Sequence, residues 1–214
     1  MGCDSPVAGS DGDVMVNLKA GAPWPMFGHD RARRGLSAFS GAQSPGIKWS
    51  VSVNAPFYSG ALTVDDDGTI YVPGGVNQPG GINKLLAVNP DGTTKWSIPT
   101  GNLSGFDSPP LIGADGTLYQ TSSTAVLRAL APANGSTIWT FAGISHDPAR
   151  RSDGTILGSN TGLLAVSPQG QLLWNHPLLP AFQIFVAPVV AADGTTYISS
   201  AGPFVAVAAD GSTR

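Results

Sequence analysis

Glutamate is absent from this chain of 214 residues, and all 14 acidic residues are aspartate. Lysine is also scarce, with four copies. Because glutamate and lysine are common on exposed helix surfaces, their scarcity argues against long surface helices. Half of the aspartates stand directly before a glycine, a pair typical of tight turns between strands. The composition therefore favours an all-β fold in which many acidic side chains belong to turns.

Cysteine and long hydrophobic runs are scarce as well. Cys3 is the only cysteine, which excludes an intramolecular disulfide and a metal site built from several cysteines. No stretch approaches the roughly 18 apolar residues of a membrane-spanning helix. The net charge is −3, so the chain has no overall basic field that would attract nucleic acid, and we expect no nucleic-acid partner.

The most informative feature that is present is a repeated phrase, Asp-Gly-Thr, followed two residues later by tyrosine in three of its four copies. The copies begin at Asp67, Asp115, Asp153 and Asp193, which are 48, 38 and 40 residues apart. A period near 40 residues is typical of propeller blades and other stacked arrays. The Asp-Gly pairs predict type I′ hairpin turns, in which glycine adopts a backbone conformation that a side chain would oppose. The four glycines are Gly68, Gly116, Gly154 and Gly194.

A second phrase, which ends in tryptophan, keeps step with the first. Its tryptophans are Trp49, Trp96, Trp139 and Trp174. Each unit has room for four short strands, as an antiparallel blade requires. In the second complete unit the predicted strands are 110–113, 117–120, 126–130 and 137–141. The same scheme fits residues 62–98 and 149–178, and begins again at residue 189.

The length sets the expected architecture. Propellers typically carry four to eight blades, and this chain holds about four to five units. We therefore predict an incomplete, C-terminally truncated propeller over residues 23–214, with exposed sheet edges at both ends. Residues 47–53 are expected to form an outer strand without its three partners. Residues 1–22 are mostly small or acidic and are expected to form a disordered tether.

Residues 129–139, Ala-Leu-Ala-Pro-Ala-Asn-Gly-Ser-Thr-Ile-Trp, resemble the tryptophan-docking repeat of the quinoprotein-like (PQQ-like repeat) β-propellers. That repeat usually reads Ala-x-Asp-x-x-Thr-Gly-x-x-x-Trp, so Ala131 and Asn134 depart from it. The opening at residues 23–30, Pro-Trp-Pro-Met-Phe-Gly-His-Asp, is similar to the segment that introduces many such propellers. Because the tryptophans recur in register with the turns, we expect each ring to lie flat between neighbouring blades. Carbohydrate stacking on these rings is the alternative.

The resemblance implies two classes of function. Some relatives are dehydrogenases that bind pyrroloquinoline quinone (PQQ) with calcium, often with an adjacent cysteine pair and a glutamate among the calcium ligands. Others are envelope lipoproteins, one of which assists the assembly of outer-membrane barrels. This chain has one cysteine and no glutamate. We therefore expect a non-catalytic, extracytoplasmic scaffold, periplasmic or on the cell surface, that binds other envelope proteins and needs no cofactor.

Two alternatives stay open: a fragment of a PQQ-dependent dehydrogenase, and a ligand-binding or sensory ectodomain of a larger surface protein. Gly2-Cys3 followed by small polar residues resembles a lipoprotein junction, in which Cys3 would carry lipid, although the apolar signal segment that should precede it is absent. The loops at 74–84 and 178–186 are the expected contact surfaces, and the second is notably apolar.

Other polar clusters have simpler explanations. Asp65, Asp66 and Asp67 fail the EF-hand spacing and are expected to form a solvated turn rather than a calcium site. His29, His146 and His176 lack partners at metal-ligand spacing. The basic cluster Arg31, Arg33 and Arg34 is expected in a solvated loop, and the pair Arg150-Arg151 carries a still weaker signal of a ligand site. No Gly-x-Ser-x-Gly elbow marks a catalytic nucleophile.

Overall fold

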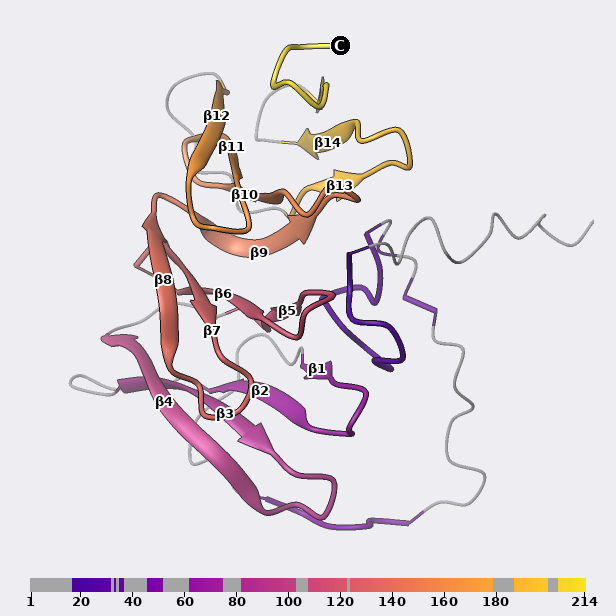
Figure 1. Ribbon diagram of the computed structural model, residues 1–214, viewed down its shortest axis with the longest axis vertical. Coiled ribbons are helices and arrows are strands. Elements are labelled where there is room, and N and C mark those ends of the chain that lie inside the picture. Colours follow the sequence, from indigo (N-terminus) through magenta and orange to yellow (C-terminus); the bar gives the residue numbers. More distant parts are fainter. Residues whose placement is uncertain are drawn as a thin grey trace, which may run out of the picture.

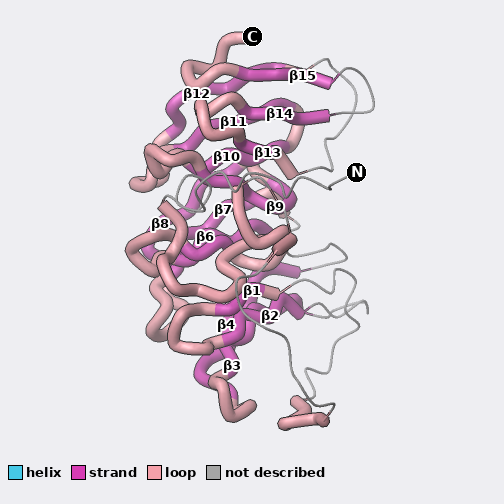
Figure 2. The backbone as a smooth tube through the Cα atoms, turned by 90° about the vertical axis from the view of Figure 1, so that its right-hand side faces the viewer, coloured by secondary structure: helices cyan, strands magenta, loops and turns pink. Residues whose placement is uncertain are grey.

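The computed structural model describes residues 17–31, 33, 35–36, 46–51, 62–74, 82–102, 108–122, 124–178, 187–199 and 204–214. The described residues form strands, turns and loops and contain no helix. Four antiparallel sheets are stacked in the order of the sequence, as Figures 1 and 2 show from two sides. The structure confirms the predicted all-β, incomplete propeller. Among the described residues, no helix is long and apolar enough to cross a membrane.

Each sheet is one blade, and strands that are consecutive in the sequence are hydrogen-bonded neighbours. Blade 1 contains β1 (Thr63–Val64), β2 (Ile70–Gly74), β3 (Ile82–Val88) and β4 (Thr94–Asn102). Blade 2 contains β5 (Leu111–Ile112), β6 (Leu118–Ser122), β7 (Val126–Leu130) and β8 (Thr137–Ala142). Blade 3 contains β9 (Ser145–Arg150), β10 (Ile156–Ser159), β11 (Gly162–Val166) and β12 (Leu172–Pro177). Blade 4 contains β13 (Val189–Val190), β14 (Thr196–Ser199) and β15 (Phe204–Val207).

The turn between the first two strands of a blade differs from the type I′ turn that the Asp-Gly pair predicts. In blade 1 the Gly68 N–H donates to the Asp65 carbonyl at 3.0 Å, and the Asp65 N–H donates to the Thr69 carbonyl at 2.9 Å. Gly68 has a φ of +79°, but Asp67 is not among the residues with positive φ. A type I′ turn needs positive φ at both central residues, so that prediction is wrong. The loop has three residues and places glycine alone in the left-handed region.

The aspartate of this loop has a different task, because its side chain caps the turn. Oδ1 of Asp67 accepts a hydrogen bond from the Thr69 N–H at 2.8 Å. The same contact recurs in blades 3 and 4, from Thr155 to Asp153 at 2.8 Å and from Thr195 to Asp193 at 3.0 Å. These are Asx turns, which explains why aspartate is the acidic residue of this chain.

An N-terminal segment, residues 17–36 where described, runs along the innermost strands. Trp24 bridges to Val64 of β1, the Pro25 carbonyl accepts the Ile112 N–H of β5 at 2.8 Å, and the Arg31 carbonyl accepts the Val190 N–H of β13 at 3.2 Å. Leu18 and Met26 of this segment are buried in the core. It therefore links blades 1, 2 and 4 on the inner side.

Two sequence-based boundaries need correction. The packed part of the chain begins by residue 17, earlier than the predicted end of the tether at residue 22, because Leu18 is buried and pairs with Gly113. Residues 1–16, including Cys3, lie outside the described residues. The predicted outer strand at 47–53 is not assigned as a strand over its described part, residues 47–51.

Candidate protein-interaction surface

The four repeated tryptophans lie at the seams between neighbouring units. In each case the indole Nε1–H donates to a backbone carbonyl of the following blade at 2.9 to 3.0 Å. The donor and acceptor pairs are Trp49 to Pro90, Trp96 to Pro132, Trp139 to Pro168, and Trp174 to Ala209. This bond satisfies the indole donor while the ring packs between the blades, so one residue type supplies both the contact area and the register of each seam.

Each tryptophan ring lies against a glycine of the next blade. A Cβ at Gly170 would lie 2.7 Å from the ring of Trp139, which is closer than real Cβ contacts allow, and Gly170 has a φ of +83°. The other seam glycines have equally close rings: Gly92, Gly135 and Gly211. The sequence analysis singled out different glycines, and missed these although three of them precede a tryptophan by four residues.

Gly68, Gly116, Gly154 and Gly194, which the repeat predicted to be structural, have φ values of +79° to +89°. Three of them face the proline of the second turn in their own blade: a Cβ at Gly68 would lie 2.8 Å from Pro90. Pro90 is also the residue whose carbonyl receives the Trp49 indole. The two repeated phrases therefore meet at one point on each seam.

Aliphatic side chains fill the seams behind the tryptophans. Between blades 1 and 2, Tyr71, Leu85 and Ala87 pack with Ile112 and Leu118, and all five are fully buried. Clusters of the same kind lie between blades 2 and 3 and between blades 3 and 4. The hydrophobic core is therefore divided among the seams, as in a stacked array.

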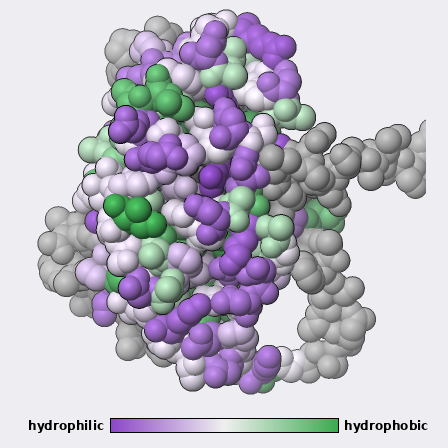
Figure 3. Space-filling model, in the orientation of Figure 1, coloured by the Kyte–Doolittle hydropathy of each residue, from purple (hydrophilic) through white to green (hydrophobic). Residues whose placement is uncertain are grey.

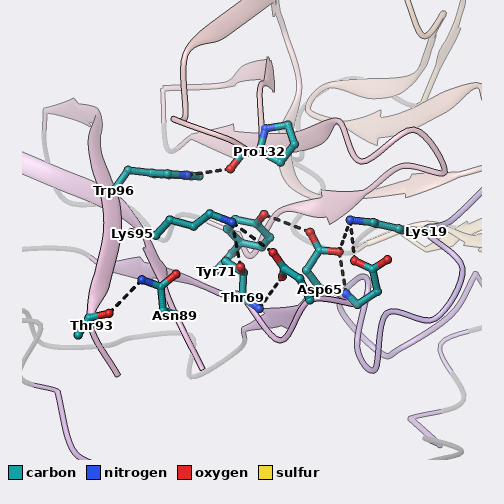
Figure 4. A network of polar contacts seen from close by, with 11 residues as sticks. Lys19, Asp65, Thr69, Tyr71, Asn89, Thr93, Lys95, Trp96 and Pro132 are labelled. Atoms are coloured by element: carbon teal, nitrogen blue, oxygen red, sulfur yellow. Dashed lines mark hydrogen bonds and ion pairs between the residues drawn. The ribbon is translucent and has the colours of Figure 1, made fainter. Parts of the chain in front are cut away.

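Blade 1 carries a polar network on its inner turn, shown in Figure 4. Nζ of Lys19 lies 2.7 Å from a carboxylate oxygen of Asp65 and 2.7 Å from one of Asp66. The hydrogen bond from Lys19 lowers the pKa of Asp66. The Tyr71 hydroxyl donates to Asp65 at 3.2 Å, and burial, together with the neighbouring carboxylates, raises the pKa of Tyr71.

This network bears on calcium, the metal of the family's dehydrogenases. In the part of the chain that the structure describes, Asp65, Asp66 and Asp67 are the one group of three acidic side chains close enough to share an ion. The ammonium of Lys19 already bridges two of them. Calcium takes six to eight oxygen ligands, so a trio that already pairs with a lysine does not fit a calcium site.

Three arginines expected at the surface or in weak clusters are buried. Arg31, Arg150 and Arg151 expose 1%, 5% and 3% of their surface. For Arg31 the expectation of a solvated loop is wrong, because the N-terminal segment lies against the inner strands. Arg34 lies outside the described residues.

Arg150 and Arg151 connect blade 3 to both neighbours. The guanidinium of Arg150 lies over the ring of Tyr119 in blade 2, 4.9 Å from its centroid. Arg151 points the other way: it donates to the carbonyls of Ala208, at 3.1 Å, and Ala209 in blade 4, and stacks on Trp174. The pair therefore has a structural task that sequence adjacency alone did not indicate.

The histidines come from three separate places in the fold. His29 is buried beside Trp24 in the N-terminal segment, with ring centroids 5.2 Å apart. His176 in β12 has its Nδ1 2.8 Å from the Gly211 carbonyl. His146 belongs to β9.

The outer strands differ at the position just before the tryptophan. In blade 1 this residue is Lys95, whose Nζ lies 3.3 Å from Asp67 and 3.1 Å from the Thr69 hydroxyl. In blades 2 and 3 the residues are Ile138 and Leu173, which expose 57% and 53% of their surface. Figure 3 shows hydrophobic groups over β8 and β12, with hydrophilic surface around them. We call Ile138, Leu172 and Leu173 the aliphatic rim.

The two loops expected to bind partners lie mostly outside the described residues, which include only 74, 82–84 and 178 from them. Leu178 is buried against the cluster between blades 3 and 4. A separate open hollow of about 430 Å³ lies on blade 4, between Val189, Tyr197 and Phe204.

Comparisons with known proteins agree with this architecture. The family model described as outer membrane protein assembly factor BamB matches residues 36–214. No curated protein matches the sequence. Among solved structures, the chain is similar to BamB from Moraxella catarrhalis, with 20% identity and a TM-score of 0.55 over 70% of this chain and 49% of that chain.

Two further structures are similar in fold. Quinohemoprotein alcohol dehydrogenase from Comamonas testosteroni has 15% identity and a TM-score of 0.72 over 92% of this chain and 41% of that chain. A streptogramin B lyase has 17% identity and a TM-score of 0.51 over 72% of this chain and 52% of that chain. The chain thus spans about half the length of these proteins or less, and at such identities the likeness shows the fold alone. With the family model matching most of its length, the chain belongs to the BamB family of PQQ-like repeat β-propellers.

Proposed function

We propose that this chain is a non-catalytic protein-binding module that takes part in outer-membrane protein assembly on the extracytoplasmic side of the envelope. The observation that carries the proposal is the aliphatic rim. Ile138 and Leu173 occupy equivalent positions in adjacent blades and both are exposed, whereas Lys95 at the same position is tied to Asp67. Exposed apolar side chains on rigid strands suit a protein contact, because little conformational freedom is lost on binding.

The acidic side chains support a structural rather than a catalytic use of the polar groups. The carboxylates of Asp67, Asp91, Asp153, Asp193 and Asp210 accept hydrogen bonds from backbone N–H groups of their own turns. Asp65 accepts from Lys19 and Tyr71. These groups contribute to the backbone of the propeller, and the proposed binding needs no cofactor from them.

The first test is capture of envelope proteins from the native host by the purified chain. Ile138→Asp combined with Leu173→Asp should reduce capture of a specific partner at least about tenfold, because charge at the centre of an apolar contact is costly to desolvate. Thr140→Asp with Asn175→Asp is the matched control, since these residues are exposed on the same two strands. Equal loss in both pairs, or in neither, would contradict binding at the rim.

A second test addresses the dehydrogenase alternative. PQQ is titrated into the chain with and without calcium, and binding is followed by absorbance. The proposal predicts no saturable change. Saturable, calcium-dependent binding would replace the scaffold function with the enzyme function.

The proposal includes membrane attachment through a lipid on Cys3. Full-length protein from the native host should then have a lipid-sized mass increment and sediment with membranes. Cys3→Ser should remove both. A soluble product of unmodified mass would contradict the anchor while leaving the rim proposal to its own test.

A further inference from the structure

The three seams within the chain use the same positions, which defines a forward face and a rear face for each blade. The forward face carries the tyrosine or leucine of the second strand and the leucine and alanine of the third. In blade 2 these are Tyr119, Leu127 and Ala129, and all three are buried against blade 3. The rear face carries aliphatic residues, such as Ile112 and Leu118 in blade 2.

Blade 4 has the same forward face without a blade to cover it. The pairing of Tyr197 with Ala206 and of Ser199 with Phe204 matches the pairing of Tyr119 with Ala129 and of Thr121 with Leu127. Phe204 therefore occupies the position of Leu127. Leu127 is fully buried, but Phe204 exposes 69% of its surface and borders the hollow of about 430 Å³.

The rear face of blade 1 has the complementary shape of chemistry. Val64, Ile70 and Val88 stand where blade 2 has Ile112, Leu118 and Leu130. Val64 and Ile70 are only half-buried, whereas their counterparts in blade 2 are fully buried. Blade 1 therefore presents an aliphatic surface of the kind that covers a forward face elsewhere in the molecule.

Trp49 adds a second complementarity. Its indole donates to the Pro90 carbonyl at 2.9 Å, and a Cβ at Gly92 would lie 2.9 Å from its ring. Trp49 thus stands where the outer-strand tryptophan of a preceding blade would stand. The described strands of blade 4, β13 to β15, leave the outer side of β15 with one isolated bridge, from Val207 to Thr213.

We propose that a second copy of this chain covers the forward face of blade 4 with its blade 1. Residues 46–51 of that copy would lie along β15, and its Val64 and Ile70 would cover Phe204 and Tyr197. One copy cannot make this contact with itself, because blades 1 and 4 lie at opposite ends of the stack in Figures 1 and 2. Two such contacts close a twofold ring of eight blades, within the four to eight that propellers use.

The test measures the mass of the purified chain in solution by sedimentation velocity across micromolar concentrations. The wild type should be a dimer. Phe204→Asp and Ile70→Asp should each weaken it at least about tenfold, because each places a charge in a desolvated apolar contact. Leu173→Asp, an exposed position away from both faces, should leave the dimer intact.

Mixing the two variants separates this arrangement from other dimers. In a mixed pair, one contact combines the two altered faces and the other combines two wild-type faces, so the mixture should form a heterodimer that neither variant forms alone. A contact between two copies of blade 4 would not be restored in this way. Phe204 is exposed, so its variant should fold, as circular dichroism will show. If Ile70→Asp does not fold, Trp49→Ala replaces it.

Four outcomes overturn the proposal. They are a monomeric wild type, open chains longer than a dimer, a dimer that is indifferent to Phe204→Asp, and a mixture of variants that stays monomeric. A dimer that is sensitive to both faces and is restored by mixing supports it. None of these results depends on whether the aliphatic rim binds an envelope partner.

Discussion

Blades 1 and 3 have the same strands and the same tryptophan seam, yet equivalent positions carry opposite chemistry. Asp65 in blade 1, which pairs with Lys19, corresponds to Arg151 in blade 3, which donates to blade 4. The ion-paired Lys95 corresponds to the exposed Leu173. The comparison teaches that the repeat fixes the backbone and the seams, while the inner turn and the outer rim are free to vary and to acquire separate tasks.

The largest expected effect comes from breaking what the two blades share. Trp139→Ala should lower the free energy of unfolding by about 3 to 5 kcal/mol, the usual cost of removing a large packed aromatic side chain. Gly170→Ala should also be strongly destabilising, because its Cβ meets the Trp139 ring and its φ is positive. Urea denaturation followed by circular dichroism measures both.

The control for that pair is Gly143→Ala. Gly143 also has a positive φ, +103°, but a Cβ there has no atom within 4 Å. Its cost should be limited to backbone strain, about 1 kcal/mol. In the double variant Trp139→Ala/Gly170→Ala the second change should cost less than it does alone. Additive losses would contradict a direct contact between ring and glycine as the reason for glycine.

The next effect sharpens the difference between the inner turns. Arg151→Met removes two hydrogen bonds to carbonyls of blade 4 and the stacking on Trp174, and should cost about 2 to 3 kcal/mol. Lys19→Met leaves the buried Asp65 without its cation and should cost about 2 kcal/mol, and this loss should shrink at acidic pH, where Asp65 can be protonated. Thermal unfolding at two pH values separates the two variants. A pH-independent loss for Lys19→Met would argue against the ion pair.

A smaller effect is expected from acid. Hydrogen bonds from the Thr195 backbone and from Arg214 lower the pKa of Asp193 to about 2, and side-chain and backbone hydrogen bonds lower the pKa of Asp91 and Asp210. Because the folded pKa lies below the ordinary value of 3.8, the stabilisation is complete above that value and is lost as pH falls toward the folded pKa. The Tm should therefore be level near neutral pH and decrease below about pH 4.

Blade 2 provides the control for this dependence, since Asn134 caps its own turn there by accepting the Ser136 N–H at 3.0 Å. The triple variant Asp91→Asn/Asp193→Asn/Asp210→Asn keeps the acceptors and removes the titrating charges. Its Tm should decrease less steeply with acid than that of the wild type. An unchanged slope would assign the acid sensitivity to other carboxylates.

The smallest effect on stability exchanges the rim residues of the two blades. Leu173→Lys gives blade 3 a lysine near Asp153 and Thr155, the counterparts of the partners of Lys95, and Lys95→Leu gives blade 1 an exposed leucine. Because surface ion pairs contribute little, each change should alter stability by less than about 1 kcal/mol. Leu173→Lys should nevertheless reduce partner capture, whereas a large loss of stability would show that the rim is structural.

The sequence predicted the fold well because the repeat is local: the strand of residues 126–130 was expected and is observed as β7. The type I′ turns were wrong because an Asp-Gly pair also fits a three-residue loop, in which aspartate caps rather than turns. The contacts of Lys19 with Asp65 and of Arg151 with Ala209 could not be predicted, because they join residues 46 and 58 positions apart. The aliphatic rim was missed for a related reason, since exposure depends on how the blades stack.

The measurement that tests the central claim most directly is photo-crosslinking in living cells of the native host. A crosslinking amino acid is placed at Ile138 or Leu173 of the rim, and at Thr140 or Lys95 as controls on outer strands. The account predicts that both rim positions crosslink to the same envelope protein and that the controls do not. Crosslinks of equal yield from all four positions, or none from the rim, would contradict a protein-binding function for this surface.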